Sequence, residues 1–315
     1  MTDVVRRVVV TPVYEDQVAA AQLIRQLKDE LGCEVFVVAV DDGSIQRPLS
    51  PSTIGDSSLD GLIIRLRRNV GHQRAIAVGL CYVAEHFPEA SCIVMDCDGE
   101  DRPETIKYLL AALEPDDVDI AVAARKNRLE SFSFKLFYFF YKFFFKCITG
   151  HSIRFGNFMA LKPHALKRLA AMHELWIHVA ACVLVSRLRI SSCPLDRGPR
   201  YTGKSKMNFS SLVLHGVRAF MVFAEDVLVR VSTTCAAVAV LSFLAIAATV
   251  LLKTTGMATP GWFSVTLGIL LLALLQTGTL AFMTLMLTGI ARNANTFAIN
   301  YRDLVDEIIS TPRRG

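Results

Sequence analysis

Apolar runs and helical stripes alternate along the first 125 residues of the chain. Five short runs have the length and composition of buried strands: Val4–Thr11, Val35–Val40, Leu62–Leu66, Cys92–Met95 and Val118–Ala124. Three intervening segments carry apolar residues at helical spacing: Asp16–Leu31, His72–Val83 and Pro103–Leu113. This alternation predicts an α/β fold with a Rossmann-like, mostly parallel sheet that is covered by helices on both faces.

A different pattern begins after residue 230, where two long stretches contain no charged residue. Val231–Leu252 is 22 residues long and Trp262–Ile290 is 29 residues long. A helix needs about 20 apolar residues to cross a bilayer, whereas a buried helix of a soluble protein seldom stays uncharged for so long. Gly and Pro residues in Lys253–Gly261 supply a turn between the two stretches. The pattern therefore predicts a transmembrane hairpin.

Basic residues predict how this hairpin crosses the membrane. The connecting loop carries Lys253 alone, while the outer flanks carry Arg218, Arg230, Arg292, Arg302, Arg313 and Arg314. Cytoplasmic flanks of membrane spans are enriched in Lys and Arg. We therefore expect a two-span protein of the cytoplasmic membrane with both termini in the cytoplasm.

Two further segments have the pattern of helices that lie along a membrane surface. Ten of the fourteen residues from Phe132 to Phe145 are aromatic, and the lysines of this stretch share one helical face. Such a helix places its rings in the bilayer interface while its lysines reach the headgroups, although a core helix is the alternative. We expect interfacial helices over residues 132–147 and 207–230.

Composition and charge narrow the possible partners. The chain is 52% hydrophobic with a net charge of +5, and its mean hydropathy is +0.40. A modest positive charge is compatible with nucleic acid, anionic lipid or phosphorylated substrates, but the globular part has no dense basic run interleaved with aromatics, which argues against nucleic acid. The eight cysteines form no Cys-x-x-Cys pair and no signal peptide is evident, so we expect reduced thiols and a cytoplasmic N-terminal domain.

Three polar clusters come directly after predicted strands. They are Pro12–Glu15, Asp41–Ser44 and Asp96–Asp101. In a parallel sheet the carboxyl ends of the strands meet at one edge, and ligands bind in the crevice beyond them. The topology alone therefore predicts a single polar site along one edge of the sheet.

The carboxylates of Asp96 and Asp98 are the strongest candidates for chemistry in this site. Side chains two positions apart in extended backbone point the same way, so these carboxylates repel each other unless a cation lies near them. Mg²⁺ prefers a few carboxylate oxygens together with phosphate oxygens of a substrate. We therefore expect the pair to hold Mg²⁺ or Mn²⁺ and a diphosphate. The alternative is a polar turn in which one Asp caps the helix that begins at Pro103.

Two more motifs have residues suited to a nucleotide. Asp41 and Asp42 can accept hydrogen bonds from a base and from ribose hydroxyls, although their run is also an ordinary turn sequence. At the start of the second predicted helix, the backbone N–H of Gly71 and the side chain of Arg74 would favour a phosphate. Between them, His72 is either a catalytic base or simply the first residue of the helix.

These motifs, in their order and spacing, resemble those of the family 2 glycosyltransferases, which have the GT-A fold. The resemblance rests on Pro12–Glu15, Asp41–Ser44, Asn69–Ala75 and Asp96–Asp98, with Asp101–Glu104 as a continuation. The two predicted spans narrow the likeness to the polyprenyl-phosphate glycosyltransferases, the group that includes dolichol-phosphate mannose synthase and the GtrB-like bactoprenol glucosyltransferases.

The resemblance implies inverting transfer of a sugar from a nucleotide sugar, with UDP favoured over GDP, to a polyprenyl phosphate such as undecaprenyl phosphate. Together with the motifs above, it gives the nucleotide-sugar-binding residues as Pro12, Tyr14, Glu15, Asp41, Asp42, Gly71, Arg74 and Asp96. The expected catalytic residues are Asp96, Asp98 and Asp101, and the metal is expected on Asp96 and Asp98.

Two positions depart from the pattern of that family. Gly99-Glu100 stands where the family often has Leu-Gln-style residues, and Asn157 stands where a Gly-Asp-Phe-Arg stretch is common. Because an amide lacks the negative charge of Asp, position 157 is without the charge that a base or a metal ligand would bring. The sugar need not be that of the best-known members.

Basic residues near the predicted membrane surface are candidates for the acceptor phosphate. Arg binds phosphate through two hydrogen bonds and Lys acts as a point charge. The candidates are Arg125, Arg128, Arg200, Lys204 and Lys206. The first two follow the fifth predicted strand, whereas the others lie in a flexible basic run whose alternative role is attraction to anionic lipid.

These predictions divide the chain into a glycosyltransferase domain, an amphipathic helix, two spans and a cytoplasmic tail. Their bounds are 1–206, 207–230, 231–252, 262–290 and 291–315. By analogy alone, a homo-oligomer such as a tetramer would form through the spans.

Two other functions compete with this prediction. A processive polysaccharide synthase usually has a Gln-x-x-Arg-Trp element and more spans, and neither Trp176 nor Trp262 has that context. A catalytically silent membrane scaffold would keep the fold, but the intact Asp41, Asp42, Asp96 and Asp98 argue against it.

Overall fold

The computed structural model describes residues 5–125, 145–152, 155–201, 209–257, 259, 261–294 and 299–311. The chain divides into two compact units. The first comprises Met1–Phe134, Ile153–Val222 and Ile299–Gly315, and the second comprises Lys135–Ser152 and Phe223–Ala298. The first unit thus contains chain segments from both sides of the long C-terminal helices.

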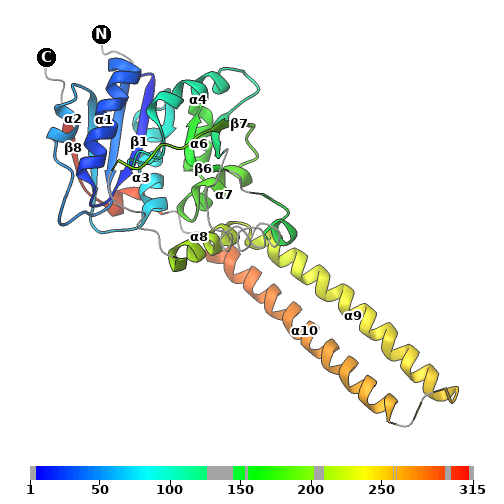
Figure 1. Ribbon diagram of the computed structural model, residues 1–315. Helices are drawn as coiled ribbons and strands as arrows, with labels where there is room; N and C mark the ends of the chain where they lie inside the picture. The colour runs from blue at the N-terminus through cyan, green and yellow to red at the C-terminus, as the bar shows by residue number, and fades with distance from the viewer. Residues whose placement is uncertain are drawn as a thin grey trace. The chain divides into compact units, whose positions relative to one another are not determined.

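The first unit is built on one sheet of eight strands (Figure 1). The strands are β1 (Arg7–Val13), β2 (Val35–Asp41), β3 (Asp60–Leu66), β4 (Ser91–Val94), β5 (Ile120–Arg125), β6 (Phe155–Leu161), β7 (Ile190–Leu195) and β8 (Val305–Thr311). Their order across the sheet is β7-β5-β6-β4-β1-β2-β3-β8. The five strands that the sequence predicts are all present, and β6, β7 and β8 are additional.

The central part of this sheet is parallel. β1 pairs in parallel with β2 and with β4, and β2 pairs in parallel with β3, so the carboxyl ends of these four strands lie at one edge. β6 runs antiparallel to β4 and β5, and β8 runs antiparallel to β3, while β7 is parallel to β5. The predicted α/β fold with a mostly parallel sheet is confirmed.

Helices cover both faces of the sheet. They are α1 (Gln17–Leu31), α2 (Ser52–Gly55), α3 (His72–His86), α4 (Ile106–Leu113), α6 (Pro163–Ala170) and α7 (Val179–Val185). A further helix of the first unit, α8 (Phe209–Val222), packs against α7. Short 3₁₀ turns occupy η1 (Gly32–Glu34), η2 (Pro103–Thr105), η3 (His173–Trp176) and η4 (Tyr301–Leu304). Residues of α3, α6 and α7 share one apolar core with the sheet, and residues of α1, α2 and α4 share the other.

Local sequence signals explain how the predicted helices begin. Asp16 precedes α1 and its side chain accepts a hydrogen bond from the Ala19 N–H at 3.4 Å, which is an N-cap. The helix predicted from Pro103 starts instead as the 3₁₀ turn η2, in which the Thr105 N–H donates to the Arg102 carbonyl three residues earlier, and α4 begins at Ile106.

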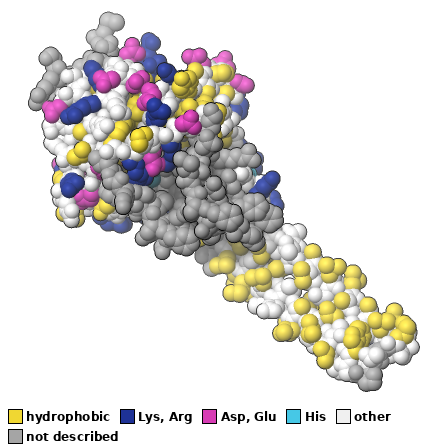
Figure 2. All heavy atoms as spheres, in the orientation of Figure 1, with side chains coloured by type: hydrophobic (Ala, Val, Ile, Leu, Met, Phe, Trp, Pro, Cys, Tyr) yellow, Lys and Arg dark blue, Asp and Glu magenta, His cyan; other side chains and the backbone are white. Residues whose placement is uncertain are grey.

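The second unit contains two long apolar helices, α9 (Ala224–Thr254) and α10 (Trp262–Ala294), which pack side by side (Figure 1). Their apolar segments have mean hydropathies of 2.6 and 2.0, long and apolar enough to cross a membrane. Figure 2 shows hydrophobic side chains along this hairpin and charged side chains gathered on the α/β unit. Within the pair, the hydroxyls of Ser232 and Thr284 lie 3.0 Å apart in a hydrogen bond.

Both helices of the hairpin are longer than the uncharged stretches 231–252 and 262–290 from which they were predicted. The amphipathic segment expected over 207–230 is divided at Phe223, where α8 ends and α9 begins. The Phe223 ring is 1% exposed and packs edge-on against Phe145 and face-on against His151 within the second unit. Most of the aromatic segment over 132–147 lies outside the described residues.

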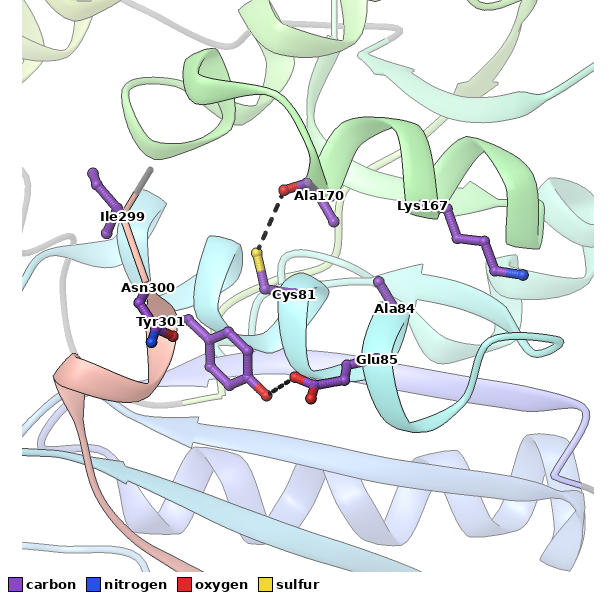
Figure 3. A pocket seen from close by; sticks show the side chains of 8 residues that line it. All are labelled: Cys81, Ala84, Glu85, Lys167, Ala170, Ile299, Asn300 and Tyr301. Carbon is purple, nitrogen blue, oxygen red and sulfur yellow. Dashed lines mark hydrogen bonds between the residues drawn. The ribbon is translucent and has the colours of Figure 1, made fainter. Parts of the chain in front are cut away.

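A shallow hollow of about 360 Å³ lies in the first unit between α3, α6 and the segment that precedes β8 (Figure 3). Tyr301 and Arg302 both donate to the Glu85 carboxylate, and the Cys81 thiol contacts the Ala170 carbonyl at 3.9 Å. The Cys81 contact joins α3 to α6, whereas the hydrogen bonds to Glu85 fix the returning chain to the C-terminal half of α3. His72 begins the same helix at its other end, so this hollow is distinct from the polar edge of the sheet.

Candidate active site

The polar loops at the carboxyl edge of the sheet are joined to one another by hydrogen bonds. The Asp42 N–H donates to the Val13 carbonyl at 2.8 Å, and the Glu15 N–H donates to the Ser44 hydroxyl at 2.8 Å. The loop after β4 adjoins β1, whose Val10 carbonyl accepts from the Met95 N–H at 3.1 Å. The three predicted clusters therefore converge.

Glu15 organises the loop that follows β2. One of its carboxylate oxygens accepts from the N–H groups of Ile45 and Gln46 at 2.6 and 3.0 Å, and the other accepts from Arg47 at 2.7 Å. The backbone of Glu15 itself has φ +50°, a conformation that side-chain-bearing residues seldom adopt. A carboxylate with three backbone donors shapes the wall of the site.

The two aspartates after β2 have a similar framework role. Asp41 is fully buried, and its oxygens accept from the N–H groups of Ser44 and Leu49 at 3.0 and 2.9 Å. Asp42 is 2% exposed, and its oxygens accept from the N–H groups of Val70 and Gly71 at 2.7 and 3.0 Å. Burial raises the pKa of Asp42, although those two N–H groups act in the opposite direction.

These contacts show which of the predicted nucleotide-binding residues are accessible to a ligand. A fully buried Asp41 cannot reach a base or a ribose, and the Gly71 N–H expected at a phosphate already donates to Asp42. Pro12 is buried within β1. Tyr14, which is 45% exposed, and Arg74, which is exposed on the first turn of α3, are open to a ligand.

Asp96 and Asp98 follow β4, as the sequence predicts. The backbone of Asp96 is held by Asp101, whose carboxylate accepts its N–H at 2.9 Å, and Asp101 is only 5% exposed. Asp98 lies in the next turn and accepts from the Glu100 N–H at 3.0 Å. Burial raises the pKa of Asp98, and the neighbouring charge of Asp96 adds to this effect.

Arg200 contacts this turn directly. Its Nη2 lies 3.0 Å from Asp98 Oδ2, and its Nε donates to Glu100 at 2.8 Å. Arg197 forms a second ion pair with Glu100, and the Tyr201 N–H donates to the Asp98 carbonyl at 2.8 Å. Arg200, expected at the acceptor phosphate, is thus engaged at the carboxylates expected to hold the diphosphate.

The unusual Gly99-Glu100 pair fits this arrangement. Gly99 has φ +93°, and a Cβ added to it would lie 2.8 Å from the ring of Tyr201. The Tyr201 hydroxyl donates to Gln26 on α1, which holds the ring in place. Glu100 accepts hydrogen bonds from both arginines. We refer to the segment Arg197–Tyr201 as the basic clasp. It contacts both Gly99 and Glu100, the two residues at which this turn departs from the family pattern.

A second group of side chains meets at the start of α3, and sequence reasoning missed its contacts. His72 Nε2 lies 3.2 Å from Asp96 Oδ1 and 3.0 Å from Asn157 Nδ2. Gln73 joins Asn157 to the backbone of α7. Burial disfavours a charged His72, but the charges of Asp96, Asp101 and Asp42 outweigh it and raise the pKa of His72. The departure at position 157 was the one signal in the sequence.

The donor set suits a divalent cation that is shared with a substrate. Among the described residues, no group of three His, Cys, Asp or Glu side chains is placed to hold a metal by itself. Mg²⁺ usually takes one or two protein carboxylates and completes its shell with substrate phosphates and water. Asp96 and Asp98, whose charges repel each other, fit that requirement.

The remaining predicted acceptor residues give less information. Arg125 ends β5, but its side chain lies outside the described set. Arg128, Lys204 and Lys206 lie outside the described residues altogether. Of the five, Arg200 alone has contacts that the described part of the chain defines.

Comparisons with known proteins agree with this architecture. Over 285 residues the chain is 25% identical to CsbB of Bacillus subtilis (strain 168), a protein assigned as a glycosyltransferase, with 85% of this chain and 82% of that protein covered. A mycobacterial protein of known structure aligns with a TM-score of 0.51 at 12% identity, over 70% of this chain and 74% of its own. That likeness shows the fold alone.

A structure of glucosyl-3-phosphoglycerate synthase from Mycobacterium tuberculosis, which holds Mn²⁺, UDP-glucose and phosphoglyceric acid, aligns with a TM-score of 0.48 at 12% identity, over 70% of this chain and 79% of its own. The family model for glycosyl transferase family 2 matches residues 8–201, a segment that contains the whole polar edge of the sheet. Because this match covers more than half of the 315 residues, the protein belongs to glycosyl transferase family 2.

Proposed function

We propose that this glycosyltransferase moves a sugar from a UDP-sugar to a polyprenyl phosphate in the cytoplasmic membrane. The observation that carries the proposal is the joining, in one chain, of a family 2 domain and two long apolar helices. Large exposed apolar surfaces of this length are suited to a bilayer as solvent. An enzyme anchored there meets an acceptor that is dissolved in the same bilayer.

The sheet topology supports a hairpin with two crossings. β8 follows α10 in the chain, yet it pairs with β3 over Gly61–Leu66. Strands of one sheet must lie on the same side of a membrane, so the chain has to return after α9 and α10. The arginine-rich flanks of the hairpin favour the cytoplasm for that side.

The proposed donor site is the polar edge of the sheet. Glu15, Asp41 and Asp42 hold its loops through backbone hydrogen bonds, which leaves Tyr14 and Arg74 as exposed side chains that can contact a nucleotide. Rigid loops placed in advance reduce the entropy lost when the nucleotide binds. These three carboxylates therefore act on the nucleotide through the loops.

The proposed reaction is a displacement at the anomeric carbon of the sugar. A phosphate oxygen of the acceptor forms a bond to this carbon while the bond from the carbon to the diphosphate oxygen breaks. The electron pair of that bond leaves with the nucleoside diphosphate, and the configuration inverts. The acceptor phosphate is anionic at neutral pH, so stabilising the leaving diphosphate is the harder task.

Asp98 and the basic clasp are suited to that task. A divalent ion held by Asp96 and Asp98 would neutralise the charge that develops on the leaving diphosphate. Arg200 lies 3.0 Å from Asp98, where its guanidinium can reach the same phosphate oxygens. We therefore place Arg200 on the leaving-group side and leave the acceptor phosphate to Arg125, Arg128, Lys204 and Lys206.

The choice of acceptor tests the proposal. Full-length protein in detergent is incubated with Mn²⁺, a panel of nucleotide sugars and either undecaprenyl phosphate or glycerol phosphate, and products are identified by mass spectrometry. We expect a sugar phosphodiester of the lipid with a UDP-sugar and no product on glycerol phosphate. Transfer to the soluble acceptor with none to the lipid would overturn the proposal.

A further inference from the structure

β8 brings residues from the C-terminal end of the chain to the sheet. The strand lies at the outer edge beside β3 (Figure 1). In this pair Glu307 is directly opposite Arg65, although the two are 242 residues apart in the chain. The segment that matches the family model ends at residue 201, so β8 lies outside it. The contacts of β8 lead to two loops of the proposed donor site.

Arg65 connects β8 to the loop that follows β2. Its Nη1 forms an ion pair with the Glu307 carboxylate, and its Nη2 donates to the Leu49 carbonyl at 2.9 Å. Its Nε lies 3.9 Å from Oδ2 of the fully buried Asp41, too far for a hydrogen bond, and has no hydrogen-bond partner among the described residues. Glu307 and Leu49 therefore set the orientation of the guanidinium.

Leu49 is held through both polar groups of its backbone. Its N–H donates to Asp41 at 2.9 Å, and its carbonyl accepts from Arg65. We call residues 45–49 the β2 loop. Near its start, three consecutive N–H groups donate to the Glu15 carboxylate. The β2 loop, which walls the polar edge of the sheet, is thus fixed at one end by Glu15 and at the other by Asp41 and Arg65.

A second set of contacts from β8 holds the loop that follows β3. The backbone N–H and the Nε of Arg67 donate to the carbonyls of Leu304 and Val305, each at 3.0 Å. This loop lies against the turn after β2, because a Cβ added to Gly43 would lie 2.5 Å from the backbone of Arg68. The beginning of β8 and the Glu307 side chain therefore support two adjacent loops of the polar edge.

Glu307 supplies the charge that keeps Arg65 in this position. Opposite charges directly across an antiparallel pair attract each other and so restrict both side chains. The Arg65 side chain is 26% exposed, so without Glu307 it can turn toward solvent and release the Leu49 carbonyl. We propose that Glu307 and Arg65 are positioning residues for the donor nucleotide, and that they raise its affinity by holding the β2 loop in the conformation that binds it. This inference rests on the proposed function, because the nucleotide is the donor of the proposed reaction.

Hydrogen exchange of the full-length protein in detergent tests the structural step. Glu307→Lys places a second positive charge opposite Arg65, so we expect the amides of the β2 loop to exchange about fivefold faster without nucleotide. Asp306→Lys is the matched control, since it makes the same change of charge on the same strand. Asp306 is exposed at the register shift between β3 and β8 and forms no ion pair within the described part of the chain. Equal exchange of the β2 loop in wild type and Glu307→Lys would overturn the inference.

Donor binding tests the functional step. We expect Glu307→Lys to weaken UDP binding in the presence of Mn²⁺ about fivefold and to raise the KM for the donor by the same factor, with kcat unchanged. The reason is that the contact holds a binding loop and touches no reacting group. A purely structural role would lower the melting temperature and the amount of active protein but leave KM unchanged. Asp306→Lys should bind UDP as the wild type does.

A double-mutant cycle tests whether Glu307 acts through Arg65. Arg65→Gln should weaken UDP binding by itself, and Glu307→Lys should add little in that background. Equal UDP affinity in wild type and Glu307→Lys, or full additivity of the two substitutions, would overturn the inference and leave the proposed function intact. Wild-type protein that binds none of the nucleotide sugars would overturn the proposed function, and the inference with it.

Discussion

Arg200 and Asp98 form an ion pair in the turn that follows β4, with Nη2 and Oδ2 3.0 Å apart. In the proposed donor site the arginine and a divalent ion are thus alternative partners for one carboxylate. Removing the arginine takes away a competing positive charge, so Arg200→Gln should bind Mn²⁺ more tightly in the absence of nucleotide. Titration of free Mn²⁺ against the protein measures this.

The same variant should lose turnover. Without the guanidinium, the leaving diphosphate has one donor fewer, and we expect kcat to fall about 10²-fold, as when an oxyanion donor is removed. Arg168→Gln, an exposed arginine on α6, is the matched control and should change neither quantity. Weaker Mn²⁺ binding in Arg200→Gln would contradict competition between Arg200 and the metal ion for Asp98.

Gly99→Ala should open the basic clasp. The added Cβ would lie 2.8 Å from the Tyr201 ring, at a backbone φ of +93° that alanine rarely adopts. The clasp and the turn must then separate, at a cost of about 1–3 kcal/mol. Faster tryptic cleavage after Arg197 and Arg200 reports the opening. Gly55→Ala, where an added Cβ meets nothing within 4 Å, should leave the rate unchanged, and equal rates in both variants would refute the packing argument.

Glu15→Gln should weaken nucleotide binding with little effect on the core. The carboxylate accepts three backbone N–H groups, and an amide would turn its NH₂ toward at least one of them. A mismatched donor costs about 1–3 kcal/mol, so the loop loosens and UDP affinity falls about tenfold or more. Calorimetric titration of UDP with Mn²⁺ measures it, with Glu114→Gln, at an exposed position after α4, as the control. Unchanged affinity would mean that the loop does not shape the site.

The contacts of Asp119 with Arg189 and His164 predict a specific pH dependence of the free energy of unfolding. Hydrogen bonds from Arg189 lower its pKa well below the ordinary value of 3.8, against the effect of burial, and His164 and the Arg189 N–H contribute further. A carboxylate with a lowered pKa stabilises the fold above its unfolded pKa, and this contribution is lost as the pH falls through the folded value.

Asp119→Asn should therefore lower the free energy of unfolding at pH 7 by about 1–3 kcal/mol. The difference from wild type should shrink as the pH falls below 3.8. Thermal unfolding in detergent, followed by circular dichroism at several pH values, measures it. Asp117→Asn, at an exposed neighbouring position, serves as control; a difference that persists in acid would refute the assignment.

The sequence predicts the central sheet because its strands are buried and flanked by turns. It does not predict β6, which lies inside the sheet between β4 and β5, or the edge strands β7 and β8. β7 includes Pro194, and β8 carries Asp306 and Glu307, which are typical of edge strands that avoid further pairing. Their short or charged patterns carry little strand signal, and the pairing of β8 with β3 joins residues about 240 positions apart.

For the site, the sequence predicts which motifs converge, because parallel strands end at one edge. It does not predict what each carboxylate does there. The sequence suggests that Asp41 and Asp42 bind a ligand from a turn. In the structure their carboxylate oxygens accept hydrogen bonds from backbone N–H groups. The partners are 100 residues apart in Glu100–Arg200 and 85 residues apart in His72–Asn157. No local sequence pattern indicates contacts over such separations.

The most direct test of the central claim is transfer of a labelled sugar by membranes that contain the full-length protein. Membranes are supplied with a labelled UDP-sugar and Mn²⁺, and label in the organic-extractable polyprenyl phosphodiester is counted with and without EDTA, in wild type and in Asp98→Asn. The account predicts lipid label in wild type that EDTA and Asp98→Asn each abolish, while the variant still folds and inserts. Undiminished label in Asp98→Asn, or no lipid label with any UDP-sugar, would contradict it.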